Sequence, residues 1–280
     1  MPTADEIRDG QRATWDRFST GWEKWDPVII NQLRPVGAAI IESLAIADNQ
    51  QHLDVAAGTG EPGLSIAPLA PNGRVVLTDL APEMLEVAKR RAAAQGITNV
   101  ETKVGSADDL PFEDATFDSI SVRFGYMFFP DLPLATAEFA RVLKPGGRVC
   151  AAVWVNPEQN AWTTIPMQAI AAEVEMPPPD PNGPGMFRCN APGMVSALYE
   201  AAGLRDVSEW DVPIEQVTAS PAGYWEMVSE VVAPAVAVLE QVDDPTRARI
   251  AATVIAKVGE FETDGTVRIP GVARCIVGTK

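Results

Sequence analysis

Three glycines near the start of the chain form a recognisable ligand-binding pattern. Gly58, Gly60 and Gly63, in the stretch HLDVAAGTGEPGL, have the spacing G-x-G-x-x-G. Glycine leaves room for a ligand to approach the backbone, and the free N–H groups at the start of a following helix attract an anion. The pattern therefore predicts a binding turn for a phosphate or a carboxylate, and the glycines alone do not choose between the two.

Two carboxylates near this turn narrow the choice of ligand. Asp54 is expected near the end of the strand before the turn, where it would repel a pyrophosphate and suit a ligand with a positive group. Asp79 is expected at the end of the next strand, where it can accept hydrogen bonds from both hydroxyls of a ribose. NAD offers the ribose alone, whereas S-adenosylmethionine offers the ribose and a zwitterionic amino-acid moiety, so the pair favours the latter.

The composition excludes several classes of partner. The chain has 280 residues, of which 46% are hydrophobic, and a net charge of -16, which disfavours binding to nucleic acid. Cys150, Cys189 and Cys275 are too few and too scattered for a disulfide framework or a zinc site, and we expect no metal. The polar start MPTADEIRDG does not resemble a signal peptide, and no apolar run has the length of a membrane span. We expect a cytoplasmic protein; the oligomeric state is left open.

Short apolar runs alternate with helical patterns through the middle of the chain. HLDVAA, RVVLTDL, NVETKVGS, FDSISVRF and GRVCAAVWV read as strands, and PEMLEVAKRRAAAQ and PLATAEFARVL read as helices between them. This alternation predicts an α/β fold with a doubly wound, mostly parallel sheet of seven strands. We expect four parts: an N-terminal helical lid over 1–45, a core over 46–217, a helical cap insert over 218–264, and the last strand of the sheet over 265–280.

Four stretches in order resemble the class I S-adenosylmethionine-dependent methyltransferases. They are LDVAAGTGEPG, VVLTDLAPEMLEVAKRR, GSADDLPFEDATFDSISVRFGYMFFPD and ARVLKPGGRV, and they are most similar to the branch of the ubiquinone and menaquinone C-methyltransferases. The resemblance covers residues 52 to about 155. It implies S-adenosylmethionine as cofactor, and it implies these cofactor-binding residues: Asp54, Ala56, Gly58, Thr59, Gly60, Asp79, Leu80, Met84, Ser106, Ala107, Asp108 and Arg123.

Within this resemblance, Gly58 and Thr59 would follow the methionine moiety, Asp79 would hold the ribose, and Ser106 with Ala107 would line the adenine. Arg123 takes the position that closes the site after the fourth strand. Two positions depart from the family pattern. Ala56 replaces a glycine common in such turns, which requires that its φ be negative. Ser106 stands where an aspartate often reaches the adenine amino group, so Asp108 or a backbone carbonyl would have to substitute for it.

The stretch RFGYMFF follows the fourth strand at the carboxyl edge of the sheet, where open parallel sheets bind ligands. It supplies the catalytic candidates Tyr126 and Arg123. Together with aromatic residues elsewhere it gives the candidates for the acceptor pocket: Trp22, Tyr126, Met127, Phe128 and Trp154. His52 is the only histidine and begins a strand at the opposite end, so we expect a structural role for it.

We therefore expect methyl transfer to a small, largely apolar molecule such as a quinol, a phenol or a polyketide-like ring. An activated donor needs alignment and exclusion of water more than acid–base help. Two alternatives remain open. An NAD-dependent oxidoreductase explains the glycines and Asp79 but not Asp54, and a non-catalytic binder of S-adenosylmethionine explains the same motifs without chemistry. Whether oxygen, carbon or nitrogen accepts the methyl group is not indicated.

Overall fold

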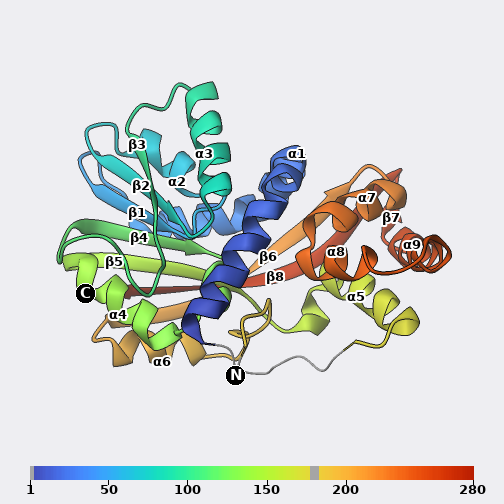
Figure 1. Cartoon of the computed structure of the whole chain (residues 1–280). Coiled ribbons are helices and arrows are strands. Elements are labelled where there is room, and N and C mark those ends of the chain that lie inside the picture. Colours follow the sequence, from blue (N-terminus) through green and yellow to red (C-terminus); the bar gives the residue numbers. More distant parts are fainter. Residues whose placement is uncertain (1–2, 177–182) are drawn as a thin grey trace.

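The computed structural model describes residues 3–176 and 183–280 (Figure 1). The predicted Pro- and Gly-rich loop over 175–187 therefore lies partly outside the described residues. One mixed sheet runs through the molecule in the order β3-β2-β1-β4-β5-β8-β6, with the short β7 paired to β8. Its strands are β1 (Gln51–Val55), β2 (Arg74–Asp79), β3 (Val100–Val104), β4 (Phe117–Arg123), β5 (Leu143–Trp154), β6 (Arg205–Thr218), β7 (Glu262–Thr263) and β8 (Thr266–Thr279).

The first five strands pair in parallel, and β8 is antiparallel to both of its long neighbours. The predicted doubly wound sheet is confirmed, with the two-residue β7 as an addition. The central strands β1, β2 and β4 are almost continuously buried, as expected for strands covered by helices on both faces. Because the strands are parallel, β1, β2 and β4 all end at one edge of the sheet, and the turns that follow them lie close together.

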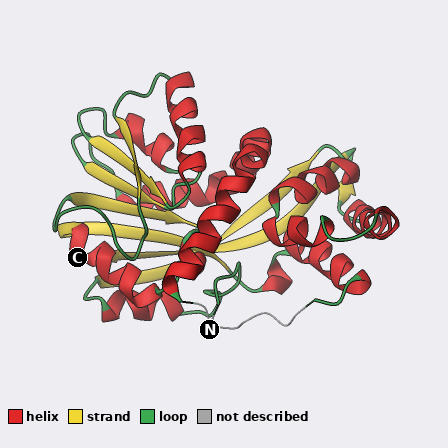
Figure 2. Ribbon diagram, viewed as in Figure 1, coloured by secondary structure: helices red, strands yellow, loops and turns green. Residues whose placement is uncertain are grey.

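Helices cover the sheet and extend beyond it (Figure 2). Apart from α1, the helices are α2 (Gly63–Ile66), η1 (Ala67–Leu69), α3 (Pro82–Ala94), η2 (Tyr126–Phe128), α4 (Leu132–Val142), η3 (Pro157–Gln159), α5 (Ala161–Glu173), α6 (Met194–Ala201), α7 (Pro221–Val231), α8 (Ala233–Leu239) and α9 (Asp244–Gly259). No single helix in the described ranges meets the length and apolarity of a membrane span. The bent pair α7–α8, at 89°, does so by length and composition only.

The N-terminal segment is one helix, α1 (Ala4–Leu44), of 41 residues with Pro27 and Pro35 inside it. It begins with a capping box: the Thr3 side chain accepts from the Glu6 N–H, and the Glu6 carboxylate accepts from the Thr3 N–H. Its second half is buried against the core. Its first half is held at the carboxyl edge of the sheet by polar contacts with the loops and with α3. In Figure 1 this helix crosses the molecule between the core and the C-terminal helices.

The two longest strands carry the C-terminal helices. β8 pairs with β5 only from Ala273 to Thr279, while its pairing with β6 continues to Val267. The unshared part of the β6–β8 ribbon projects past the end of the sheet, and α7, α8 and α9 pack on it (Figure 1). Ion pairs from Lys24 to Glu226 and Glu230 tie α1 to α7. The helix α1 therefore bridges the cofactor edge of the sheet and the C-terminal helices.

Candidate functional site

Asp54 is a structural centre beneath the glycine turn. Its Oδ2 accepts the Gly63 N–H at 2.9 Å, its Oδ1 accepts the Ser121 hydroxyl at 2.6 Å, and the side chain is fully buried. Burial raises its pKa to about 7, against the opposing hydrogen bonds. The prediction that Asp54 faces a positive group of the ligand is therefore not supported, since the residue lies beneath the cavity wall. The carboxylates that line the cavity are those of Glu61 and Asp79.

Asp79 ties the first turn to the second and also faces the cavity. Its Oδ2 accepts the Gly58 N–H at 2.8 Å, and its Oδ1 accepts the Ala81 N–H at 2.9 Å. Burial raises the pKa of Asp79, and the N–H groups of Ala81 and Gly58 oppose that rise by stabilising the charged form. A carboxylate oxygen has further acceptor capacity beyond one bond. Asp79 can therefore hold the loop and accept the hydroxyls of a ribose at the same time.

Three residues of the first turn have a positive φ, and two of them, Gly58 and Ala56, line the cavity. Gly58 has φ 54° and Ala56 has φ 53°, so the expectation of a negative φ at Ala56 is wrong. This conformation is sterically less favourable for alanine than for glycine, because of the alanine Cβ. Gly125, which follows β4, packs on this residue: a Cβ on Gly125 would lie 2.4 Å from the Ala56 Cβ. Close approach of the two turns explains the absence of a side chain at Gly125.

In the turn after β3, the small residues line the cavity and the acidic residue Asp108 does not. Ser106 and Ala107 line the cavity, as does Gly105. Asp108 does not line it, because one of its oxygens accepts the Ser106 hydroxyl and the other accepts from Arg8 of α1 at 3.0 Å. The expected substitution of Asp108 for an adenine-binding acid is therefore not supported. The ion pair instead fastens the start of α1 over this end of the cavity.

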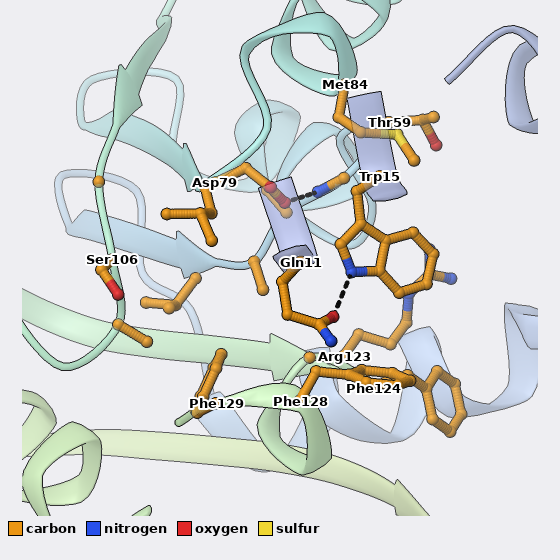
Figure 3. A pocket seen from close by; sticks show the side chains of 18 of the residues that line it. Gln11, Trp15, Thr59, Asp79, Met84, Ser106, Arg123, Phe124, Phe128 and Phe129 are labelled. Atoms are coloured by element: carbon orange, nitrogen blue, oxygen red, sulfur yellow. Dashed lines mark hydrogen bonds between the residues drawn. The ribbon is translucent and has the colours of Figure 1, made fainter. Parts of the chain in front are cut away.

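The other predicted cofactor residues surround one cavity (Figure 3). Gly60 is the exception, because it is buried outside the lining, where an added Cβ would lie 2.7 Å from the Leu64 side chain. The predicted residues that line the cavity are Ala56, Gly58, Thr59, Asp79, Leu80, Met84, Ser106, Ala107 and Arg123. The residues that the sequence did not single out come mainly from α1 and from the ends of the strands: Arg8, Gln11, Leu33, Val55, Ala57, Glu61, Gly105, Phe124, Gly125, Phe129 and Pro130.

A second cavity, of about 560 Å³, adjoins the first and has a mostly apolar lining. The two share a wall formed by Gln11, Trp15, Trp22, Leu33, Phe124 and Phe128. In that wall the Trp15 ring meets the rings of Trp22 at 6.1 Å and Phe128 at 5.4 Å, edge to face in both cases. Figure 3 shows Trp15 above the cofactor cavity and Phe124 and Phe128 below it. Because these residues line both cavities, the two cavities are adjacent, and the charged side chains of Asp79, Glu61 and Arg123 belong to the first one alone.

The candidates for the acceptor pocket divide into two groups. Trp22 and Phe128 belong to the shared wall, and Trp154 lines the second cavity and stacks on Phe124 with 4.0 Å between ring centroids. Tyr126 and Met127 line neither cavity and are fully buried in the core. The Tyr126 hydroxyl bonds that of Thr136, and burial raises its pKa well above the usual range. Tyr126 is therefore excluded as a base at the site.

Arg123 brings a guanidinium group to the cofactor cavity. It lines the first cavity and not the second. Among the residues that the structure describes, none forms a hydrogen bond or an ion pair with its side chain. Burial lowers its pKa, while the charges of Glu61 and Asp54 oppose that change. A half-buried guanidinium with free donors is well suited to bind an anionic group of a ligand.

His52 belongs to a buried hydrogen-bond chain under the site. Its Nδ1 lies 2.8 Å from the Ser119 hydroxyl and its Nε2 lies 2.9 Å from the Ser121 hydroxyl, which donates to Asp54. With Ser121 donating to Asp54, the Nε2 of His52 carries the proton. Burial lowers the pKa of His52 to about 3, so the ring is neutral. No group of acidic, cysteine or histidine side chains within residues 3–176 and 183–280 is arranged to hold a metal ion.

Comparisons with known proteins identify the family of the chain. The model of the ubiE/COQ5 methyltransferase family matches residues 27–170. The demethylmenaquinone methyltransferase of Thermus thermophilus is 40% identical over 113 residues, which are 40% of this chain and 51% of that protein. The demethylmenaquinone methyltransferase of Deinococcus radiodurans is 32% identical over 171 residues, 59% of this chain and 69% of that protein. The alignments thus span between about half and two thirds of these relatives.

A solved structure supports the fold independently. The YcgJ protein of Bacillus subtilis superposes with a TM-score of 0.57 at 22% identity, covering 87% of this chain and 97% of that one. The family match includes the glycine turn, Asp79 and the shared aromatic residues after β4, and it ends before β6 and the C-terminal helices. The chain belongs to the ubiE/COQ5 methyltransferase family and is an S-adenosylmethionine-dependent methyltransferase.

Proposed function

We propose that the chain methylates a small, largely apolar molecule, of the quinol, phenol or polyketide-like ring type, that binds in the second cavity. The observation that carries this proposal is the shared wall of Trp15, Trp22, Phe124 and Phe128 between the cofactor cavity and the apolar cavity. A methyl group passes only between molecules in contact, so the acceptor has to lie against the cofactor cavity. The relatives named demethylmenaquinone methyltransferases support a quinone-type acceptor.

The residues of the first cavity fit S-adenosylmethionine by their chemistry. Asp79 would accept the ribose hydroxyls, and Ser106 with Ala107 would flank the adenine. Arg123, with free donors beside the glycine turn, would hold the carboxylate of the methionine moiety. Because Arg123 lines only the cofactor cavity, this role is favoured over the alternative that it binds an anionic acceptor. The bound cofactor supplies a methyl group on a sulfonium, which leaves as a neutral thioether without an acid.

In such a reaction the chain would orient the two reactants and exclude water from them. The helix α1 covers the carboxyl edge of the sheet, fastened by Arg8 to Asp108 and by Arg91 of α3 to Asp26 at 3.1 Å. The aromatic side chains that line both cavities would exclude water from the place where donor and acceptor meet, which favours attack by the acceptor over attack by solvent. The single histidine is buried and neutral, and Tyr126 lies in the core, so neither side chain is placed to take a proton from the acceptor.

Incubation of the protein with methyl-labelled S-adenosylmethionine and a panel of apolar ring acceptors tests the proposal. We expect label in an organic-soluble product. In the variant Met227→Trp, whose new side chain enters only the second cavity from α7, we expect transfer to fall by about tenfold or more while the affinity for S-adenosylhomocysteine is unchanged. Labelled product at the wild-type rate in this variant would contradict the placement of the acceptor. Binding of NAD in place of S-adenosylmethionine would contradict the function itself.

A further inference from the structure

Two buried amides interrupt the apolar lining of the second cavity. Gln32 lies on α1 and is 4% exposed, and Gln216 lies on β6 and is fully buried. Both occupy positions where the local pattern calls for an apolar residue. Gln32 lies on the buried stripe of α1 next to Ile29 and Leu33, and Gln216 follows Ile214 on the inward face of β6. Their amide groups are therefore placed in the wall of the cavity by the folding pattern itself.

Each amide has a buried polar atom without a partner in the described part of the chain. These atoms are the Nε2 of Gln32 and the Oε1 of Gln216, and the Nε1 of Trp22 in the same lining is a third. The Nε2 of Gln216 makes only a long bond, at 3.5 Å, to the carbonyl of Val217. A buried polar group without a partner costs stability that an apolar side chain of similar shape would not. The amides thus weaken the fold where methionine or leucine would strengthen it.

The charge of the lining restricts the ligand further. Arg17 is the charged residue among those that line the second cavity in the described ranges, and it is exposed at the rim, where it pairs with Glu240. A charged ligand would lose its hydration inside the cavity and find no partner. The unpartnered atoms comprise two donors, on Gln32 and Trp22, and one acceptor, on Gln216. They complement a neutral molecule with an oxygen that accepts and a hydroxyl that donates.

We propose that Gln32 and Gln216 determine acceptor specificity: the Gln32 amide donates to a carbonyl-type oxygen, and the Gln216 amide accepts from a hydroxyl of an uncharged, apolar-ringed acceptor. This inference rests on the proposed function, because it takes the second cavity as the acceptor site. It goes further by naming the residues that select the acceptor. Gln216 lies outside residues 27–170, which match the family model. The acceptor selectivity that Gln216 provides would therefore come from the C-terminal part of this chain and not from the part that the family model describes.

The test is a binding cycle with four two-ring probes and the variants Gln32→Met and Gln216→Met, each saturated with S-adenosylhomocysteine. The probes are 4-hydroxybenzophenone, benzophenone, 4-hydroxydiphenylmethane and diphenylmethane, which carry both, one or neither of the two oxygen functions. Calorimetry gives the dissociation constants. For the wild type we expect each oxygen function to tighten binding by about tenfold. Gln32→Met should abolish the advantage of the carbonyl alone, and Gln216→Met that of the hydroxyl alone.

Controls separate specificity from folding and from the proposed function. Gln50→Met removes another amide with a buried unpartnered oxygen, outside the cavity lining, and should leave all four affinities unchanged. The two cavity variants should unfold at the same temperature as the wild type or higher. The charged probe 4-benzoylbenzoate should bind at least tenfold more weakly than benzophenone. Equal loss of affinity for all probes in a cavity variant, or no change for any, would overturn the proposal.

The binding cycle does not depend on turnover, so the two proposals fail in different ways. Selective binding of the oxygenated probes with no labelled product from any acceptor would contradict methyl transfer and leave the specificity of the amides standing. Labelled product whose yield and KM are the same in Gln32→Met and Gln216→Met as in the wild type would contradict the role of the amides and leave methyl transfer standing.

Discussion

The methyl group of Ala56 lies where a side chain on Gly125 would have to go: a Cβ built on Gly125 comes within 2.4 Å of the Ala56 Cβ. The two residues follow neighbouring strands, β1 and β4, and both line the cofactor cavity. Gly125 has φ −87°, a value that any residue accepts. The need for glycine there comes from its neighbour and not from the backbone. Ala56, with φ 53°, carries the backbone strain instead.

A pair of substitutions tests this relationship. Gly125→Ala should lower the free energy of unfolding by about 1–3 kcal/mol through overpacking, and should weaken binding of S-adenosylmethionine because the two turns move apart. Ala56→Gly should be close to neutral, because relief of the left-handed alanine, about 1 kcal/mol, opposes the entropy cost of a glycine. The double variant should recover the stability of Ala56→Gly. Urea unfolding and calorimetry measure both quantities, and additive losses in the double variant would refute the contact.

Asp79 is expected to be the residue whose loss most affects cofactor affinity. Asp79→Ala removes the acceptor for two ribose hydroxyls, with a cost of about 2–4 kcal/mol in binding free energy. It also releases the N–H groups of Gly58 and Ala81, so unfolding should be measured alongside binding. Asp79→Asn, which keeps one acceptor oxygen, should give an intermediate affinity. Unchanged binding of S-adenosylhomocysteine by folded Asp79→Ala would remove this residue from the site.

The parts of the fold that the sequence predicts are those with local causes. Buried apolar runs predict β1, β2 and β4, and the spacing of Gly58, Gly60 and Asp79 predicts the cofactor edge. The roles of Asp54 and Asp108 were not predictable in this way. Asp54 lies near the end of β1 and Asp108 lies in the turn after β3. Hydrogen bonds from Ser121 to Asp54 and from Arg8 to Asp108, both between residues distant in sequence, hold these acids outside the cavity lining.

The second cavity has no local signature because remote elements build it. Its lining comes from α1, β5, β6, α7 and α8, which are brought together only by the sheet order and the projecting β6–β8 ribbon. Gln32 and Gln216 look like ordinary polar residues until their burial is known. The one available signal was a polar residue interrupting an apolar stripe on a helix and on a strand. The prediction for Tyr126 is wrong for a different reason. This aromatic residue follows β4 at the carboxyl edge of the sheet, as expected, but its side chain is buried in the core and its hydroxyl bonds that of Thr136.

His52 should make the protein less stable in acid. Burial lowers its pKa from 6.5 to about 3, so the unfolded chain binds a proton in this interval that the folded chain does not. The contribution is therefore complete above pH 6.5 and is lost as the pH falls toward 3, by at most about 1.4 kcal/mol per pH unit. His52→Gln lacks this titration. The difference in the free energy of unfolding between this variant and the wild type should therefore become smaller between pH 7.5 and pH 4.5. A difference that stays constant over this range in urea unfolding would contradict the assignment.

The same variant separates stability from catalysis, because the structure gives His52 no access to either cavity. Folded His52→Gln should keep a kcat close to that of the wild type under conditions where both are fully native. A large loss of kcat in the native variant would show that the buried chain through Ser121 and Asp54 reaches the reacting groups. Circular dichroism at the assay temperature provides the control for folding.

The pH dependence of turnover should reflect the ionisation of the acceptor and not that of an enzyme side chain. His52 is neutral and buried, and Tyr126 is held in the core with a raised pKa, so the described residues place neither of these bases at the shared wall. An acceptor that binds as the neutral phenol and loses its proton in the site before the transfer then supplies its own nucleophile. Across a series of substituted phenols, the inflection of kcat/KM with pH should follow the ionisation of each phenol, and Tyr126→Phe should leave every inflection in place.

Arg123→Met should raise the KM for S-adenosylmethionine without moving the inflections, since the guanidinium lines the cofactor cavity alone. An inflection that stays near the pKa of imidazole for all acceptors, or one that moves upward in Arg123→Met, would show that an enzyme group controls the ionisation at the reacting atom.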